Sequence, residues 1–144
     1  MTVAAILKHK GHEVARVAPS ATVAEVAKRL REKRIGAILV MDQADQLLGI
    51  VSERDIVANL AEHGALALEM TASQVMTRLL HTVSPQATVP EAMAQMTNRR
   101  VRHLPVLDGT RLVGIVSIGD IVKARIDQQA HEVDSLKAYV AGAA

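Results

Sequence analysis

The sequence contains one unit written twice, and this internal repeat constrains the fold more than any other feature. Residues 17–25 (VAPSATVAE) match residues 83–91 (VSPQATVPE) at an offset of 66. Further along, residues 48–57 (LGIVSERDIV) match residues 113–122 (VGIVSIGDIV) at an offset of 65, so one residue is lost between the two blocks. Chance is a poor explanation for two blocks aligned in this way, and we interpret the chain as an internal duplication.

Each copy predicts the same order of elements: strand, helix, strand, strand, helix. The first strand ends at a proline, which has no N–H for a ladder hydrogen bond. A Thr-x-x-Glu pattern follows, and this spacing is typical of a capping box at a helix start. The expected strands are residues 13–18, 35–41 and 47–51, then 79–84, 101–107 and 112–116; the first helices begin after Thr22 and Thr88 and end near Glu32 and Asn98, and the last helices begin at Ser52 and Ser117.

Two further segments are expected to be helical. Residues 58–73, rich in Ala and Leu, connect the two copies. Near the C-terminus, six mostly apolar residues recur at alternating spacings of four and three, which predicts one stripe on a helix. That stripe either packs on its own repeat or meets a second chain. Its members are Val122, Ile126, Gln129, Val133, Leu136 and Val140.

The pattern Gly-h-h-Ser-x-x-Asp, where h is apolar, occurs at residues 49–55 and again at 114–120. One interpretation is purely structural, because Ser-x-x-Asp resembles a capping box. The other is a binding site. A helix N-terminus attracts anions, and an Asp carboxylate can accept two hydrogen bonds from a ribose diol. The preceding glycine would then let the backbone approach the ligand closely.

Composition excludes several classes of function. Without cysteine the chain has no disulfide, thiolate metal site or Cys nucleophile. Tyr139 is the only aromatic residue, so single-stranded bases lack a stacking platform, and 17 basic residues are nearly matched by 15 acidic ones. We therefore expect no nucleic-acid partner. No apolar run approaches the ~20 residues that span a bilayer, and we expect a cytoplasmic protein without a membrane segment.

Catalytic patterns are also missing from the sequence. Neither Ser52 nor Ser117 lies in a Gly-x-Ser-x-Gly motif, and no His-Glu-x-x-His metal motif occurs. His9 and His12 are three residues apart, but we interpret them as surface histidines. We therefore expect neither an enzyme nor a metal site.

The duplicated unit, the Gly-Ile-Val-Ser-x-x-Asp-Ile-Val block and residues 102–106 (RHLPV) together resemble a CBS domain pair, also called a Bateman module. The resemblance covers roughly residues 3–126. It implies a mixed α/β (α+β) fold in which tandem β-α-β-β-α repeats pack around a pseudo-two-fold axis, with an extra C-terminal helix. The implied division is residues 1–70 for repeat 1 with its connecting helix, 71–126 for repeat 2 and 127–144 for the C-terminal helix. No catalytic domain is expected outside the repeats.

The resemblance also implies two clefts between the repeats that bind AMP, ADP, ATP, NAD or S-adenosylmethionine. By analogy, Asp55 and Asp120 would hold ribose hydroxyls, with Ser52 and Ser117 beside the sugar or phosphate. Gly36 and Ala37 stand where the second copy has Arg102 and His103, so we expect unequal sites. The remaining candidates are Ile35, Gly36, Ala37, Arg102, His103, Leu104 and Pro105 around the adenine, and Arg54, Arg100, Arg102 and His103 for phosphate.

Two functions remain open at this point. In the first, adenine-nucleotide occupancy changes a homodimer or its docking to an unidentified regulated protein. In the second, the chain is a dimerisation scaffold with vestigial clefts. The aspartate in both copies favours the sensor, because capping alone would tolerate Asn, Ser or Thr.

Overall fold

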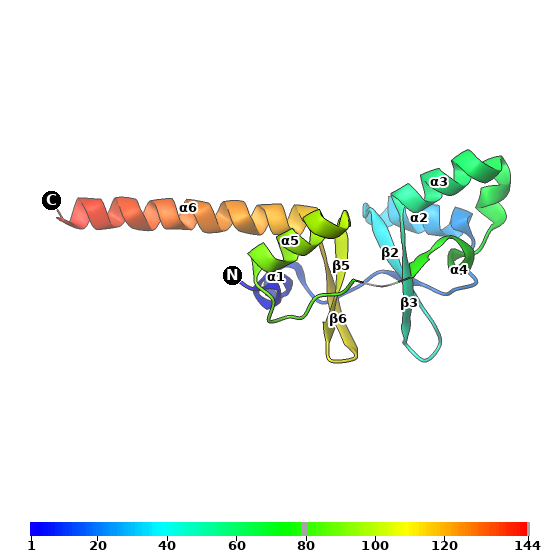
Figure 1. The fold of residues 1–144 in the computed structure, drawn as a ribbon, viewed down its shortest axis with the longest axis horizontal. Coiled ribbons are helices and arrows are strands. Elements are labelled where there is room, and N and C mark those ends of the chain that lie inside the picture. The colour runs from blue at the N-terminus through cyan, green and yellow to red at the C-terminus, as the bar shows by residue number, and fades with distance from the viewer. Residues whose placement is uncertain (79–80, 144) are drawn as a thin grey trace. The chain divides into compact units, whose positions relative to one another are not determined.

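The structure is a computed structural model that describes residues 1–78 and 81–143 (Figure 1). The chain forms two compact units. One comprises Glu13–Leu80, and the other joins Met1–His12 to His81–Ala144. The compact units therefore divide the chain differently from the sequence repeat, because the first twelve residues belong with the second copy.

The unit Glu13–Leu80 is built on a four-stranded sheet. The strands β1 (Arg16–Val17), β2 (Ala37–Met41), β3 (Leu47–Ser52) and β4 (Thr77–Arg78) lie in that order. β1 is parallel to β2, and the other pairs are antiparallel. All five residues of β2 are buried, as a continuous apolar run predicts.

Helices α2 (Val23–Lys33), α3 (Glu53–His63) and α4 (Ala72–Val75) complete this unit, with a 3₁₀ helix at Gly64–Glu69. α2 begins with the expected capping box between Thr22 and Glu25. Its apolar residues at spacings of three and four pack against the sheet. The core formed in this way includes Val23, Val26 and Leu30 of α2, Ile38 and Val40 of β2, Val51 of β3 and Val75 of α4.

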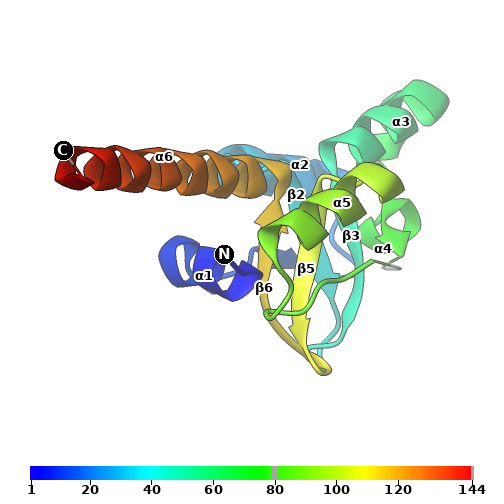
Figure 2. The same cartoon turned by 60° about the vertical axis from the view of Figure 1, so that its left-hand side comes forward.

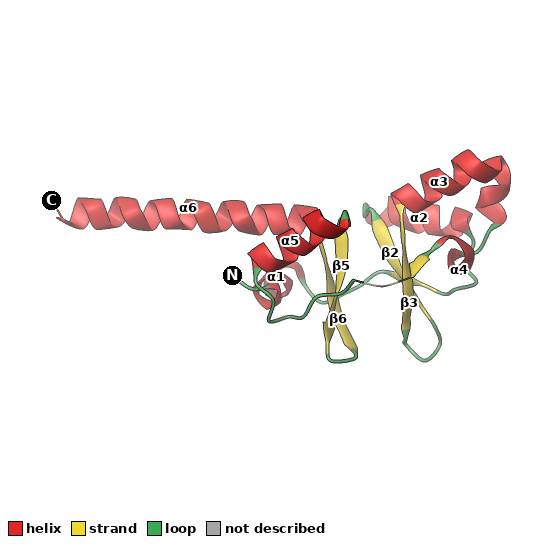
Figure 3. Cartoon of the chain, viewed as in Figure 1, coloured by secondary structure: helices red, strands yellow, loops and turns green. Residues whose placement is uncertain are grey.

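In its described residues the other unit contains one hairpin and three helices (Figure 3). Strands β5 (His103–Asp108) and β6 (Arg111–Ser117) pair antiparallel. Helices α1 (Val3–Lys10), α5 (Val89–Arg99) and α6 (Ile118–Ala143) accompany them, and α5 begins with the expected Thr88–Glu91 capping box. Val3, Ile6 and Leu7 of α1 lie in the same core as Leu104, Val116 and Ile121.

The two units repeat each other's pairing. Val17 pairs with Val40 in a parallel arrangement in the first copy, and the parallel bridge between Val83 and Val106 matches it in the second. A bridge joins Thr22 to Thr71 at the start of α4, and a similar one joins Thr88 to Thr2 at the start of α1. α1 therefore has in its unit the position that α4 has in the other.

Most of the expected elements are confirmed, including both hairpins, both first helices and the helix starts at Ser52 and Ser117. The expected first strand of the first copy is too long, because β1 has two residues. Among the described residues 81–84 of the second copy, only Val83 forms a bridge to the neighbouring strand. Residues 79–80 of the expected strand 79–84 lie outside the described residues. The connection 58–73 is largely helical but is interrupted at Gly64 and Met70.

The fold is mixed α+β and carries the expected extra C-terminal helix, α6. No helix in the described ranges is both long and apolar enough to cross a bilayer.

Candidate functional site

The first Ser-x-x-Asp element lies where β3 ends and α3 begins. Ser52 is the N-cap of α3, and its Oγ accepts a hydrogen bond from the Asp55 N–H at 3.3 Å. Oδ2 of Asp55 accepts in return from the Ser52 N–H at 2.8 Å and from the Ser52 hydroxyl at 3.0 Å. The capping interpretation of this pattern is therefore confirmed. Oδ1 of Asp55 accepts a further hydrogen bond, at 3.1 Å, from the hydroxyl of Thr77 in β4.

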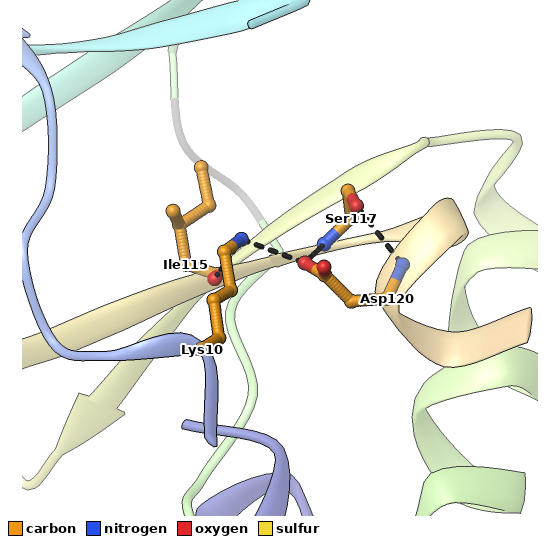
Figure 4. Close-up of polar contacts among 4 residues, drawn as sticks. All are labelled: Lys10, Ile115, Ser117 and Asp120. Atoms are coloured by element: carbon orange, nitrogen blue, oxygen red, sulfur yellow. Dashed lines mark hydrogen bonds and ion pairs between the residues drawn. The ribbon is translucent and has the colours of Figure 1, made fainter. Parts of the chain in front are cut away.

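The second element has the same geometry at the start of α6. Ser117 Oγ accepts from the Asp120 N–H at 3.1 Å, and Asp120 Oδ2 accepts from the Ser117 N–H at 2.8 Å. Figure 4 shows the additional partner. Lys10 Nζ lies 2.6 Å from Asp120 Oδ2 and also donates to the carbonyl of Ile115 at 2.9 Å. Within the described part of the chain, Oδ1 of Asp120 accepts no hydrogen bond.

The surroundings of Asp120 lower its pKa. Partial burial alone would raise the pKa, but three other effects outweigh it. These are the hydrogen bond from Lys10, the hydrogen bonds from Ser117 and the positive charge of Lys10. Asp120 is therefore held as a carboxylate in the folded protein.

The glycine of each Ser-x-x-Asp element lets other residues of the same unit pack closely against its Cα. A Cβ on Gly49 would lie 2.7 Å from both Met76 Sδ and the Thr77 carbonyl oxygen, and one on Gly114 would lie 2.7 Å from Leu7 Cδ2. The expectation that these glycines admit a ligand is wrong, because protein atoms fill that space in both copies.

The candidate residues at the starts of β2 and β5 lie beside the Ser-x-x-Asp element of their own copy. In one unit Ala37 pairs with Ser52, and the Glu53 N–H donates to the Gly36 carbonyl at 3.0 Å. The neighbouring Ile35 N–H donates to Leu30 instead. In the other unit His103 pairs with Ser117, and the Ile118 N–H donates to Arg102 at 2.8 Å. Each unit therefore brings together a strand start, a Ser and an Asp.

The remaining candidates differ in exposure. Leu104 and Pro105 are buried within β5, and Leu104 lies in the hydrophobic core. Arg54, Arg100 and Arg102 are exposed and form no ion pair with any described residue. Their guanidinium groups can meet solvent or an anion.

The sequence interpretation missed two residues that contact these elements. Lys10 and Thr77 contact the two aspartates from positions 110 and 22 residues away, and no local pattern signals such contacts. Arg34 is the counterpart of the candidate Arg100 in the repeat, and both have a left-handed backbone, Arg34 at the end of α2 and Arg100 at the end of α5. The offset of 66 relates these two arginines.

One open hollow lies elsewhere on the unit Glu13–Leu80. It measures about 750 Å³ and is lined by residues 16–20 and 41–44, at the C-terminal ends of β1 and β2. None of the candidate residues lines it. We give the Ser-x-x-Asp elements more weight, because they combine charge, hydroxyls and a helix N-terminus.

Comparisons with known proteins agree with the repeat. The family model of the CBS domain matches residues 6–62 and 72–127. A mitochondrial CBS domain-containing protein of Arabidopsis thaliana is 34% identical over 125 residues, which cover 84% of this chain and 61% of that protein. The chain spans 54 to 66% of the length of this and two further relatives.

Solved structures give the same result. A CBS-domain protein from Agrobacterium tumefaciens is similar with a TM-score of 0.84 and 40% identity, over 86% of this chain and 92% of that one. A CBS domain protein from Pyrobaculum aerophilum, complexed with AMP, has a TM-score of 0.74 and 26% identity, over 83% of this chain and 89% of that one.

Proposed function

The chain belongs to the CBS-domain family, and from this premise we propose that it is a regulatory module that binds an adenine nucleotide. The proposed ligands are AMP, ADP, ATP, NAD or S-adenosylmethionine. Binding would be reported through a homodimer or through contact with a regulated protein. The module would act in the cytoplasm, without a catalytic residue or a metal.

One observation carries the proposal: in both copies the capping box uses Oδ2 of the aspartate and leaves Oδ1 outside the cap. Oδ1 of Asp55 accepts one hydrogen bond from Thr77, and a carboxylate oxygen has two lone pairs. Oδ1 of Asp120 accepts none from the described residues. Capping a helix and accepting a ribose hydroxyl are therefore compatible roles for each carboxylate.

Exposed arginines support a phosphorylated ligand. Arg54 follows Ser52 at the start of α3, and Arg100 and Arg102 lie between α5 and β5 in the other unit. Guanidinium groups pair with phosphate oxygens through two hydrogen bonds. Complexation of the Pyrobaculum protein with AMP supports the same ligand class.

The scaffold function is the second candidate, and a specific observation favours it. Both aspartates are already engaged within their own units, Asp55 by Thr77 and Asp120 by the ammonium group of Lys10. A carboxylate that only caps a helix and pairs with a lysine needs no ligand. In that case the chain would dimerise without responding to nucleotides.

A thermal-shift panel with the five ligands distinguishes these functions. A ligand present at about 100 times its Kd stabilises the folded state by about 2.7 kcal/mol. The melting temperature should rise with at least one ligand, and Asp55→Asn or Asp120→Asn should reduce that rise, because an amide offers one acceptor oxygen instead of two. The chain contains no Trp, so the melt is followed with a dye or by calorimetry.

Glu25→Gln is the matched control, because Glu25 has the same capping role at the start of α2. It should leave the ligand response intact. No rise with any of the five ligands would contradict the proposal. An unchanged rise in both Asp variants, with a lower baseline melting temperature, would assign these carboxylates to capping alone.

A further inference from the structure

Helix α6 packs on its unit only near its start. Ile121 and Ala124 are buried there, in the core that includes residues of α1 and α5. Residues 129–142 are all exposed. Figures 1 and 2 both show this part of α6 extending away from the rest of its unit. An isolated helix as short as residues 129–142 is only marginally stable in water without tertiary packing.

Of the two alternatives for the C-terminal stripe, the structure does not show packing on its own repeat. The apolar members of the stripe are between 45% and 63% exposed, and the neighbouring Tyr139 is 74% exposed. Single exposed apolar residues are ordinary, whereas a continuous row on one helix face marks an interaction site. The exposed members are Val122, Ile126, Val133, Leu136 and Val140.

The type of residue along the stripe is compatible with a two-stranded coiled coil. In heptad notation the a positions are Ile126, Val133 and Val140, and the d positions are Val122, Gln129 and Leu136. In parallel coiled coils, branched residues at a with Leu at d favour two strands. All three a residues here are branched, Leu136 is the one Leu at d, and Gln129 is the one polar member of the stripe.

The flanking charges favour a parallel orientation of the two helices. Glu132 is at a g position, and Lys137 is at the following e position. In a parallel pair, Glu132 of each helix faces Lys137 of the other, which gives two attractive contacts. In a fully overlapped antiparallel pair, Glu132 would face its own copy and Lys123 would face Lys137, so like charges would meet.

We propose that the exposed part of α6 pairs with the same helix of a second copy of this chain, forming a short parallel coiled coil. This deepens the proposed function by locating its dimer contact. The inference rests on the homodimer of that proposal and not on nucleotide binding. The two can fail separately, because the association of the chains is measured as mass and the response to nucleotides as a thermal shift.

The first test is the mass of the full chain in solution, measured by sedimentation velocity at increasing concentration. Leu136→Asp places a charge in the seam and should raise the Kd of the dimer more than about tenfold. His131→Asp, on the outer face of the same helix, is the matched control and should leave the Kd unchanged. A wild-type monomer at about 100 μM, or a Leu136→Asp variant that dimerises like the wild type, would overturn the proposal.

Introduced cysteines test whether the two helices are parallel or antiparallel. The chain has no cysteine of its own that could interfere. Val140→Cys should form a disulfide between two copies under mild oxidation. In the antiparallel pair the two introduced thiols would lie about 27 Å apart, at 1.5 Å per residue, and would not react. A mixture of Val122→Cys and Val140→Cys chains that links position 122 to position 140 instead would contradict the parallel arrangement.

A charge exchange tests the flanking pair. Glu132→Lys alone should weaken the dimer by about five- to tenfold, because attractive contacts become repulsive. Adding Lys137→Glu in the same chain should restore the wild-type Kd. Failure of the double variant to recover would exclude the Glu132–Lys137 contact.

Discussion

Asp55 and Asp120 occupy equivalent positions in the repeat but have different partners. Asp55 accepts from the neutral hydroxyl of Thr77, whereas Asp120 pairs with the ammonium group of Lys10. The Lys10 side chain is 34% exposed and that of Asp120 is 24% exposed, so water screens their attraction. The hypothesis of unequal sites therefore has a second basis besides the arginines, because among the described residues a lysine pairs with Asp120 and no cation pairs with Asp55.

The ion pair predicts a pH dependence. The pKa of Asp120 is lowered in the folded protein, so its contribution to stability is fully present above its unfolded pKa of about 3.9 and is lost as the pH falls through the folded pKa. Lys10→Met should lower the free energy of unfolding by less than about 1 kcal/mol at neutral pH. The wild-type and variant curves should converge below about pH 4.

Urea denaturation in steps from pH 7 to pH 3 measures this difference. Lys8→Met is the control, because Lys8 is exposed on the same helix and makes no side-chain hydrogen bond or ion pair with the described residues. A difference between Lys10→Met and wild type that stays constant down to pH 3 would exclude Asp120 as its source.

The two glycines of the repeated motif predict unequal costs of substitution. An added Cβ at Gly49 meets the backbone oxygen of Thr77, whereas at Gly114 it meets the end of the Leu7 side chain, whose carbons shift at a lower cost than backbone atoms. Gly49→Ala should therefore cost about 2 to 3 kcal/mol of the free energy of unfolding, and Gly114→Ala about 1 kcal/mol. Urea denaturation at pH 7 gives both values. Gly142→Ala, with open space around it, should be close to neutral, and an equal cost at 49 and 114 would refute the packing argument.

At the scale of elements, the sequence predicts whatever depends on neighbouring residues. The capping boxes at Thr22 and Thr88 are visible as four-residue patterns, and both form. The apolar runs that become β2 and β5 are equally local. The lengths of the first strands are not local in this sense. The length of β1 depends on where the chain meets β2, and no pattern within residues 13–18 predicts that position.

The unit in which α1 packs is the main feature that the sequence does not predict. Thr2 and Thr71 cap equivalent helices at the starts of the two copies, but α1 packs in the unit of the second copy and α4 in the unit of the first. The two helix sequences, TVAAIL at 2–7 and TASQVM at 71–76, resemble each other only weakly, so the sequence alone does not pair them. The contact of Lys10 with Asp120 depends on this placement, which explains why the candidate site was predicted only in part.

At the scale of the molecule, each compact unit includes the helix that begins the other copy of the repeat, since the CBS matches start at residues 6 and 72. In one unit Ala72 and Val75 of α4 join the core, and in the other Val3, Ile6 and Leu7 of α1 do. Burying these side chains contributes roughly 1.5 to 3 kcal/mol for each Val, Leu or Ile. For units of this size, that contribution is large compared with the whole free energy of unfolding.

Fragments of nearly equal length test this division. Residues 13–80 contain the complete core of their unit, whereas residues 1–70 carry α1 without its unit and lack α4 and β4. We expect fragment 13–80 to melt cooperatively by circular dichroism and fragment 1–70 to melt at a lower temperature or without a transition, because Ala72 and Val75 no longer cover α2 and β3. For the same reason, fragment 71–144 should gain helical signal when residues 1–12 are supplied as a peptide. If fragment 1–70 is the more stable of the first pair, the sequence repeat and not the compact unit is the folding unit.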